Sequence, residues 1–319
     1  MRKLFGLAIV ALVAAVAALG MLWWSAGPKP GPHRVTIEEG STLALVARQL
    51  DAAGIIPGNA ATFRGMAKIF GSSDPVQAGE FEIPLGASAA EVLDILQHGR
   101  PVVRLVTIAE GMPSIIVQEK LAAIPELKGP APLPLEGAVL PDSYDWQKGE
   151  TRAAVLKRMT DAMDKELTAL WAKRKGSCVS SPQEAIILAS IVEKETGKPS
   201  ERKMVAGVYC NRLKIGMKLD ADPTVIYPIT KGKPLGRRIK RSELNAITGY
   251  NTYREPGLPD GPIANPGRDS IAAVLDPAPT KALYFVADGT GGHVFADTLA
   301  EHNANVAKWY AIRRARGEM

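Results

Sequence analysis

The longest apolar run in the chain covers residues 4–24 and contains no charged side chain. Because a helix rises about 1.5 Å per residue, a run of this length is enough to cross a hydrocarbon core of about 30 Å. Arg2 and Lys3 precede the run, and Trp23 and Trp24 close it. The pattern predicts a single transmembrane helix over 4–24, with its basic end in the cytoplasm and the two tryptophans at the outer interface.

This prediction makes residues 1–3 a cytoplasmic end and exports everything after about Ser25. A cleaved signal peptide is the alternative, because Ala18-Leu19-Gly20 resembles a cleavage site, although the apolar run continues beyond it. The Gly/Pro-rich sequence that follows predicts a spacer over residues 25–32. We expect the folded region to begin near His33, outside the cell inner (cytoplasmic) membrane in the periplasm.

A strand, a glycine turn and an amphipathic helix recur three times in the next part of the chain. Residues 35–50 and residues 106–121 share Val, Thr, Ile, Glu, Gly, Val and Leu at matching positions, and residues 81–97 repeat the pattern more loosely. Each unit begins with alternating apolar and polar positions and continues with helical spacing. The expected helix caps are Thr42, Ser114 and Ser88, the last with Glu91 in the capping-box position.

Composition supports a folded chain of roughly two domains, since 319 residues are 46% hydrophobic and 23% charged. The net charge of +6 is dispersed except for a cluster over 231–241, which is interpreted as a solvated basic loop rather than a nucleic-acid site. Cys178 and Cys210 are the two cysteines, and their spacing indicates no metal site. A disulfide between them is possible but unsupported. His293 and His302 have no spaced partner that would indicate a metal, so both are interpreted as structural or substrate-contacting.

A candidate acid lies in a helix that Ser181 and Pro182 open. Helical spacing places Glu195 beside the apolar side of this helix, in its last turn, where burial and the helix dipole both favour a protonated carboxyl. A general acid near neutral pH needs such a raised pKa. Periodicity leaves Glu193 equally eligible.

The segments downstream are rich in Gly, Pro, Asn, Thr, Tyr and Asp, over 211–227, 250–253, 257–267 and 283–303. Such side chains suit a polysaccharide cleft, although they also suit ordinary turns. The helix after Glu301 ends in several arginines and is expected to be a solvated tail.

Two resemblances add to this interpretation. The strand, glycine turn and helix over residues 33–104 resemble the LysM domain, a small β-α-α-β module that binds N-acetylglucosamine-containing glycans. From about Val35 to its end, and strongly from Glu136 onward, the chain resembles the MltG (YceG-like) family of endolytic murein transglycosylases. The matching motifs are SIVEKET, NRL, DPTVIY, YNTY, GLP, IANPG, YFVADG, GGHVF and EHN, in order and at similar spacing.

The resemblance implies an α+β fold, with the transmembrane helix, a small LysM-like subdomain and a larger mixed α/β catalytic domain over 105–319. It also implies a lyase that needs no cofactor or metal. Glu195, the second glutamate of the EKE sequence, would be its catalytic acid and base. It would break the bond between N-acetylmuramic acid and N-acetylglucosamine without water and leave a 1,6-anhydro end. The candidate substrate-binding residues are Asp222, Tyr227, Asn251, Tyr253, Asn211 and Glu193.

The partners implied are peptidoglycan strands, the membrane and cell-wall synthases, with no nucleic acid. Two alternatives stay open from the sequence. The first is a non-catalytic peptidoglycan-binding scaffold, and the second is a hydrolase in which Asp222 supplies the second carboxylate that water-based glycosidases use.

Overall fold

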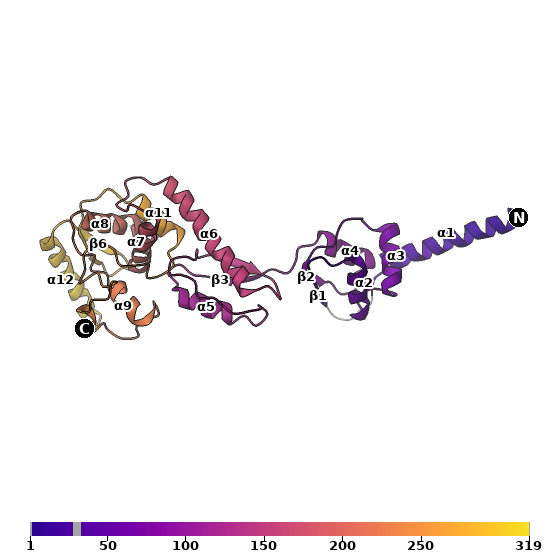
Figure 1. Cartoon of the computed structure of the whole chain (residues 1–319), viewed down its shortest axis with the longest axis horizontal. Coiled ribbons are helices and arrows are strands. Elements are labelled where there is room, and N and C mark those ends of the chain that lie inside the picture. The colour runs from indigo at the N-terminus through magenta and orange to yellow at the C-terminus, as the bar shows by residue number, and fades with distance from the viewer. Residues whose placement is uncertain (1, 28–32, 319) are drawn as a thin grey trace. The chain divides into compact units, whose positions relative to one another are not determined.

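The computed structural model describes residues 2–27 and 33–318, without the side chains of residues 2–5 and 8. The chain forms two compact units, residues 1–104 and residues 105–319 (Figure 1). Both combine helices with two-stranded sheets, so the predicted mixed α and β architecture is confirmed. Most of the predicted spacer, residues 28–32, lies outside the described residues.

The first unit has the element order β-α-α-β followed by a further helix. The elements are β1 (His33–Ile37), α2 (Leu43–Ala52), α3 (Ala60–Phe70), β2 (Gly79–Ile83) and α4 (Ala89–His98). Strands β1 and β2 pair antiparallel, with Val35 opposite Phe81. The predicted caps are present, because Thr42 accepts from the Leu45 amide and Ser88 forms a capping box with Glu91. The local patterns therefore predicted β1, α2, β2 and α4, whereas the second helix of the β-α-α-β order, α3, followed only from the LysM resemblance.

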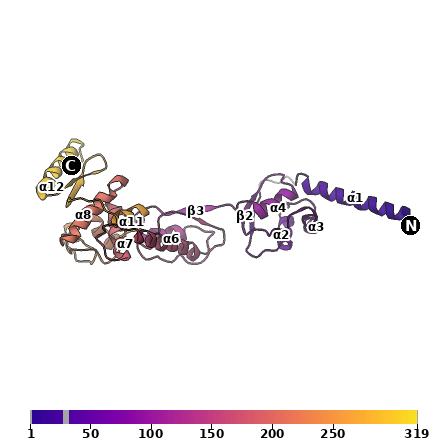
Figure 2. The same ribbon diagram turned by 90° about the horizontal axis from the view of Figure 1, so that it is seen from above.

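Helix α1 (Arg2–Trp24) belongs to the first unit and leaves it as a long rod (Figure 2). Its last turns are part of the core, since Trp23 is 2% exposed and its ring lies 5.8 Å from that of Phe63. The ring of Trp24 packs against that of Phe70, with the ring centroids 5.2 Å apart. Placing Trp23 at a membrane interface was therefore wrong, because it packs inside the protein, and the folded region begins well before His33.

The described residues contain no helix that reaches the length and apolarity required to cross a membrane. The predicted span over 4–24 includes Leu4, Phe5 and Ala8, whose side chains lie outside the described residues. A helix is present over this segment, and its crossing of a membrane stays a prediction.

The second unit begins with a small α and β layer. Strand β3 (Arg104–Thr107) pairs with β4 (Ser143–Trp146), and α5 (Ser114–Ala122) and α6 (Arg152–Ala172) pack on them around buried Val117. Ser114 was predicted to cap α5 but lies inside its first turn. Its amide donates to Glu136 Oε1 at 2.9 Å, and Pro113 takes the cap position without a side-chain bond.

The main core of the second unit surrounds α7 (Pro182–Glu195), which packs against both α8 (Arg202–Lys214) and α11 (Arg268–Leu275). The three helices lie close together in both views (Figures 1 and 2). All eight residues from Ala185 to Val192 are buried. A helix buried all round has no polar face, and this explains why helical periodicity could not assign its last carboxylates to a side.

The remaining elements surround this core. They are η1 (Pro199–Glu201), α9 (Asp222–Thr230), α10 (Arg241–Leu244), the antiparallel hairpin β5 (Tyr284–Ala287) and β6 (His293–Ala296), and α12 (Leu299–Ala315). Helix α12 packs along the hairpin (Figure 1). In the basic segment 231–241, Lys233 pairs with Glu119 and Arg237 pairs with Glu243, and no described lysine or arginine there is buried. This agrees with the solvated loop that was expected.

Cys178 and Cys210 form a disulfide, with their Cα atoms 5.3 Å apart. The sequence offered no support for this bond because their separation of 32 residues says nothing about distance in space. The bond ties the chain before α7 to the middle of α8.

We expect the double variant Cys178→Ser, Cys210→Ser to unfold at a lower temperature. Closing a loop of this length contributes about 3–4 kcal/mol by the chain-entropy model, or roughly 10 °C in a unit of this size. Calorimetry with and without reductant would measure the difference. If reductant lowered the wild-type midpoint no more than that of the double variant, the disulfide would have no stabilising role.

Candidate functional site

The second unit contains a cleft of about 680 Å³, with Glu195 among its lining residues. Its walls come from the end of α7, from α8, from the 219–222 segment, from Tyr253, from β5 and from α12. Seven of the lining side chains are aromatic or imidazole rings: Tyr209, Tyr253, Tyr284, Phe285, His302, Trp309 and Tyr310. Such a lining suits sugar rings, which present both apolar faces and hydroxyl groups.

The carboxyl group of Glu195 is held mostly out of water. Burial and the nearby charge of Asp222 raise its pKa from an ordinary value of 4.5 to about 7, against opposing effects of the Tyr209 hydroxyl and Arg212. No hydrogen-bonding partner for its Oε1 is found among the described residues. Glu195 therefore titrates near neutral pH, where a substantial fraction is protonated, and one of its oxygens has no hydrogen bond to the described residues, as a general acid requires.

Glu193, two residues earlier, has a different environment. Its Oε2 accepts from the Gly267 amide at 2.9 Å, and its Oε1 lies 3.7 Å from Arg202 Nη2. Arg202 also pairs with Glu110 at 2.8 Å. Glu193 therefore joins α7 to neighbouring loops and does not line the cleft, so the choice that periodicity left open is resolved by what each carboxylate contacts.

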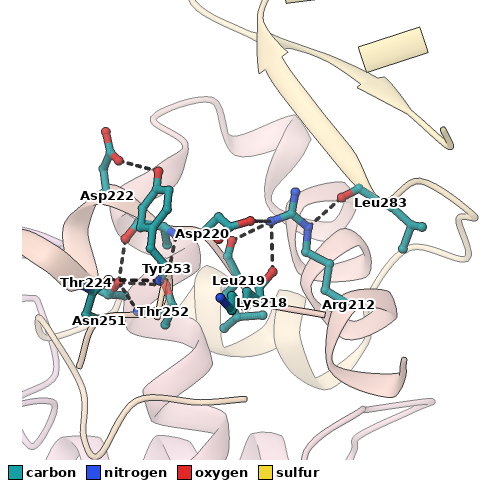
Figure 3. Close-up of polar contacts among 11 residues, drawn as sticks. Arg212, Lys218, Leu219, Asp220, Asp222, Thr224, Asn251, Thr252, Tyr253 and Leu283 are labelled. Atoms are coloured by element: carbon teal, nitrogen blue, oxygen red, sulfur yellow. Dashed lines mark hydrogen bonds and ion pairs between the residues drawn. The ribbon is translucent and has the colours of Figure 1, made fainter. Parts of the chain in front are cut away.

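Asp222 and Tyr253 meet at the cleft, as Figure 3 shows. The Tyr253 hydroxyl donates to Asp222 Oδ1 at 2.7 Å. Beneath them, the hydroxyls of Thr224 and Thr252 lie 2.8 Å apart, which fixes the start of α9 against the 250–253 loop. Burial and the bond to Asp222 raise the pKa of Tyr253, so its hydroxyl stays protonated and can act as a donor.

Arg212 joins three separate segments at the cleft (Figure 3). Its guanidinium donates to Leu283 O at 2.7 Å and to Leu219 O at 2.7 Å, and it lies 3.8 Å from Asp220 Oδ2. Asp220 has a positive φ of 50°, an uncommon backbone conformation for a residue other than glycine. The arginine therefore secures an irregular loop in the wall nearest to the acid.

Three predicted binding residues lie elsewhere. Tyr227 is 8% exposed and packs against Tyr250, with the ring centroids 4.9 Å apart and the ring planes tilted by 42°. Asn251 is 1% exposed, and its side-chain amide donates to three backbone carbonyls. Asn211 binds the carbonyls of Thr280 and Ala282. These contacts hold loops in place, and none of the three side chains lines the cleft that contains Glu195, so their role in substrate binding stays a prediction.

Several cleft residues were not among the predicted site residues: Tyr209, Arg212, Tyr284, Trp309, Tyr310 and Arg313. Of these, Arg212 and Tyr284 lie in the matching NRL and YFVADG motifs, which could have pointed to them. His302 had been left as structural or substrate-contacting, and it lines the cleft stacked on Tyr284 at 5.2 Å. The last turns of α12 had been expected to be a solvated tail, which is wrong for Arg313. His293 instead pairs with buried Glu201 at 2.8 Å and joins the hairpin to η1.

The first unit has a separate cleft of about 450 Å³. Its walls are the turn before α2, with Ser41 and Thr42, and the loop between α3 and β2, residues 71–76. Both loops supply small hydroxyl-bearing residues and backbone groups. No cluster of potential metal ligands occurs among the described residues of either unit.

A carboxyl of raised pKa in an aromatic-lined cleft is typical of enzymes that cleave polysaccharides. The chain belongs to the YceG-like family, whose profile matches residues 35–308. The crystal structure of a putative YceG-like protein from Listeria monocytogenes has the same fold, with a TM-score of 0.52 and 26% identity over 86% of this chain and 98% of that one.

Two sequence relatives carry the name endolytic murein transglycosylase. The one from Streptococcus pneumoniae serotype 2 (strain D39) is 29% identical over 86% of this chain and 58% of its own length. The one from Bacillus subtilis (strain 168) is 35% identical over 56% of this chain and 49% of its own length. The chain therefore spans about half to three fifths of the length of these relatives.

The two glutamates should differ in what they contribute to stability. Glu193→Gln removes the charge facing Arg202, so we expect a loss of about 1–3 kcal/mol. Because the folded-state pKa of Glu195 is raised, its protonated form favours folding, and stability should fall as pH rises from 4.5 to about 7. Glu195→Gln should remove about 2–3 kcal/mol of the change between pH 5 and pH 8.

Denaturant unfolding of both variants at pH 5 and pH 8 measures these effects. Equal pH dependence in the wild type and Glu195→Gln would contradict the raised pKa. A Glu193→Gln variant as stable as the wild type would contradict its structural role.

Proposed function

We propose that this chain is a peptidoglycan lytic transglycosylase that cuts glycan strands internally, with Glu195 as the catalytic residue. The single observation that carries the proposal is the carboxyl of Glu195, which is buried in an aromatic-lined cleft that raises its pKa to about 7. Membership of the YceG-like family and the names of its relatives agree with this activity and with an endolytic mode.

In the proposed reaction, Glu195 first gives its proton to the bridging oxygen between N-acetylmuramic acid and N-acetylglucosamine. The bond from that oxygen to the anomeric carbon breaks, and the leaving sugar departs as an alcohol. The carboxylate then removes the proton of the C6 hydroxyl, whose oxygen attacks the anomeric carbon and closes the 1,6-anhydro ring. Glu195 is reprotonated in the same turnover, so no water is consumed.

Asp222, held in place by Tyr253, would stabilise the positively charged sugar that forms during this step. Asp222 is near enough to influence the pKa of Glu195, and its negative charge favours a cation at the anomeric carbon. Its bond to Tyr253 fixes one of its two carboxylate oxygens. A hydrolase would instead use Asp222 to activate water, and this alternative differs from the proposal in the chemical end that it leaves.

We also propose that the first unit binds the glycan in the cleft between its two loops, as a LysM-like module. Its β-α-α-β order and the hydroxyl-bearing loop residues support this role. If the chain bound glycan there but did not cleave it, the alternative of a non-catalytic peptidoglycan-binding scaffold would hold.

The proposed location is the periplasmic face of the inner membrane, with α1 as a single-pass anchor. Two observations favour it. The apolar residues Leu7, Val10 and Leu12 of α1 are more than 60% exposed, and the Cys178–Cys210 disulfide requires an oxidising compartment. Cell-wall synthases would share this location and are the proposed protein partners.

Glu195→Gln should lower cleavage of purified peptidoglycan by about 10²-fold to 10⁴-fold, because glutamine cannot donate the proton. Mass spectrometry of the products should show 1,6-anhydro ends for the wild type. Glu193→Gln, assayed below its unfolding temperature, is the matched control and should still give these ends. Reducing ends would indicate the hydrolase, and intact strands with bound protein would indicate the scaffold.

The activity should fall as pH rises above about 7, by about tenfold per pH unit, because only the protonated form of Glu195 can begin the reaction. The measurement is initial rate at limiting substrate between pH 5 and pH 9. A rate that stayed constant up to pH 9 would mean that Glu195 is not the acid.

A further inference from the structure

Helix α12 presents one face to the cleft that contains Glu195. The residues on this face follow helical spacing: Leu299, His302, Val306, Trp309, Tyr310 and Arg313. No residue of α12 is buried, so this face is not part of a core. The helix therefore leaves its apolar and aromatic side chains at the cleft, where a bound molecule could cover them.

Two adjacent aromatic rings on this face differ in how they are held. Trp309 is partly buried against the β5–β6 turn, where a β-carbon at Gly289 would lie 3.5 Å from its ring. Tyr310 is 44% exposed. A ring secured on one side and open on another loses little freedom when a flat ligand packs on it, and aromatic faces pack well on the C–H faces of sugars.

Arg313 gives the same face a positive charge. Its guanidinium carbon lies 5.9 Å from the Trp309 ring centroid, and its Nε lies 3.4 Å from Glu318 Oε2. The wall formed by Asp220 and Asp222 is acidic, so charge is distributed unevenly around the cleft. A ligand with an apolar ring face and a carboxylate would match the α12 wall.

We propose that α12 forms an additional subsite for the glycan strand, in which Trp309 and Tyr310 stack on a sugar ring and Arg313 pairs with a carboxylate of the attached peptide. This inference rests on the proposed function, because it assumes that the ligand is a peptide-bearing glycan. Trp309, Tyr310 and Arg313 lie beyond residue 308, where the family profile stops matching. The subsite is therefore assigned from the structure of this chain alone.

Trp309 provides a direct probe, because a sugar stacked on it would change its fluorescence. The test uses the full chain with Glu195→Gln, so that ligands are bound but not cut. One ligand is a hexamer of N-acetylglucosamine, which has no carboxylate, and the other is a soluble glycan strand carrying peptides. Both should change the emission, and the change should disappear in Trp309→Phe but persist in Trp171→Phe, which alters a tryptophan outside the cleft.

Two further variants separate stacking from charge. Tyr310→Ala should weaken binding of both ligands by about tenfold, because each loses a stacked ring. Arg313→Ala should weaken only the peptide-bearing strand, by about threefold to tenfold. Arg314→Ala, which alters the adjacent arginine outside the cleft lining, is the matched control and should change neither affinity. Unchanged unfolding midpoints would establish that each variant is folded.

The subsite is wrong if Trp309 emission does not respond to either ligand, or if Tyr310→Ala binds both as tightly as its parent. Equal losses in Arg313→Ala and Arg314→Ala would reject the carboxylate contact. The proposed function is tested separately. The chain with Glu195 intact is incubated with peptidoglycan, and the products are analysed for 1,6-anhydro ends. If the ligands bound with this pattern but peptidoglycan was not cleaved, the subsite would be supported and the proposed transglycosylase activity would be refuted.

Discussion

Burying the carboxyl group of Glu195 is the constraint on which the second unit depends. A carboxyl taken out of water is stable only if it stays protonated or finds a partner, and Glu195 has the Tyr209 hydroxyl as its main direct contact. The helix that carries it is buried on every side, so the residue at its end is held firmly. The surrounding packing therefore maintains an acid that water would otherwise ionise.

The same helix shows how position decides the role of a side chain. Glu193 and Glu195 are separated by one residue, yet Glu193 faces Arg202 and the Gly267 amide, whereas Glu195 faces the cleft. Successive residues in a helix point about 100° apart, so two residues apart they face nearly opposite sides. One carboxylate therefore stabilises the junction with α11, and the other is available for chemistry.

The cleft is assembled from segments far apart in the chain, and Arg212 is central to that assembly. It binds backbone carbonyls on two loops, so the 218–220 segment and the entry to β5 keep a fixed distance from α8. The disulfide at Cys210, two residues before Arg212, holds α8 itself to the chain before α7. In the first unit, Trp23 has a comparable role, because it anchors α1 in the core and makes that helix part of the folded body.

Local patterns were sufficient for many of the elements. The strand, glycine turn and capped helix units and the start of α7 at Ser181 could be recognised in the sequence, because caps, turns and periodicity act over a few residues. Periodicity left Glu193 and Glu195 equally eligible as the acid, and the resemblance carried by the collinear motifs selected Glu195. The sequence could not show that Cys178 meets Cys210, that Trp23 is buried, or that Asn211, Tyr227 and Asn251 support loops. It also missed Tyr209, Arg212 and the α12 face, since each of these depends on which distant segment packs against it. Burial and contact across the fold, which no local spacing encodes, gave these residues their roles.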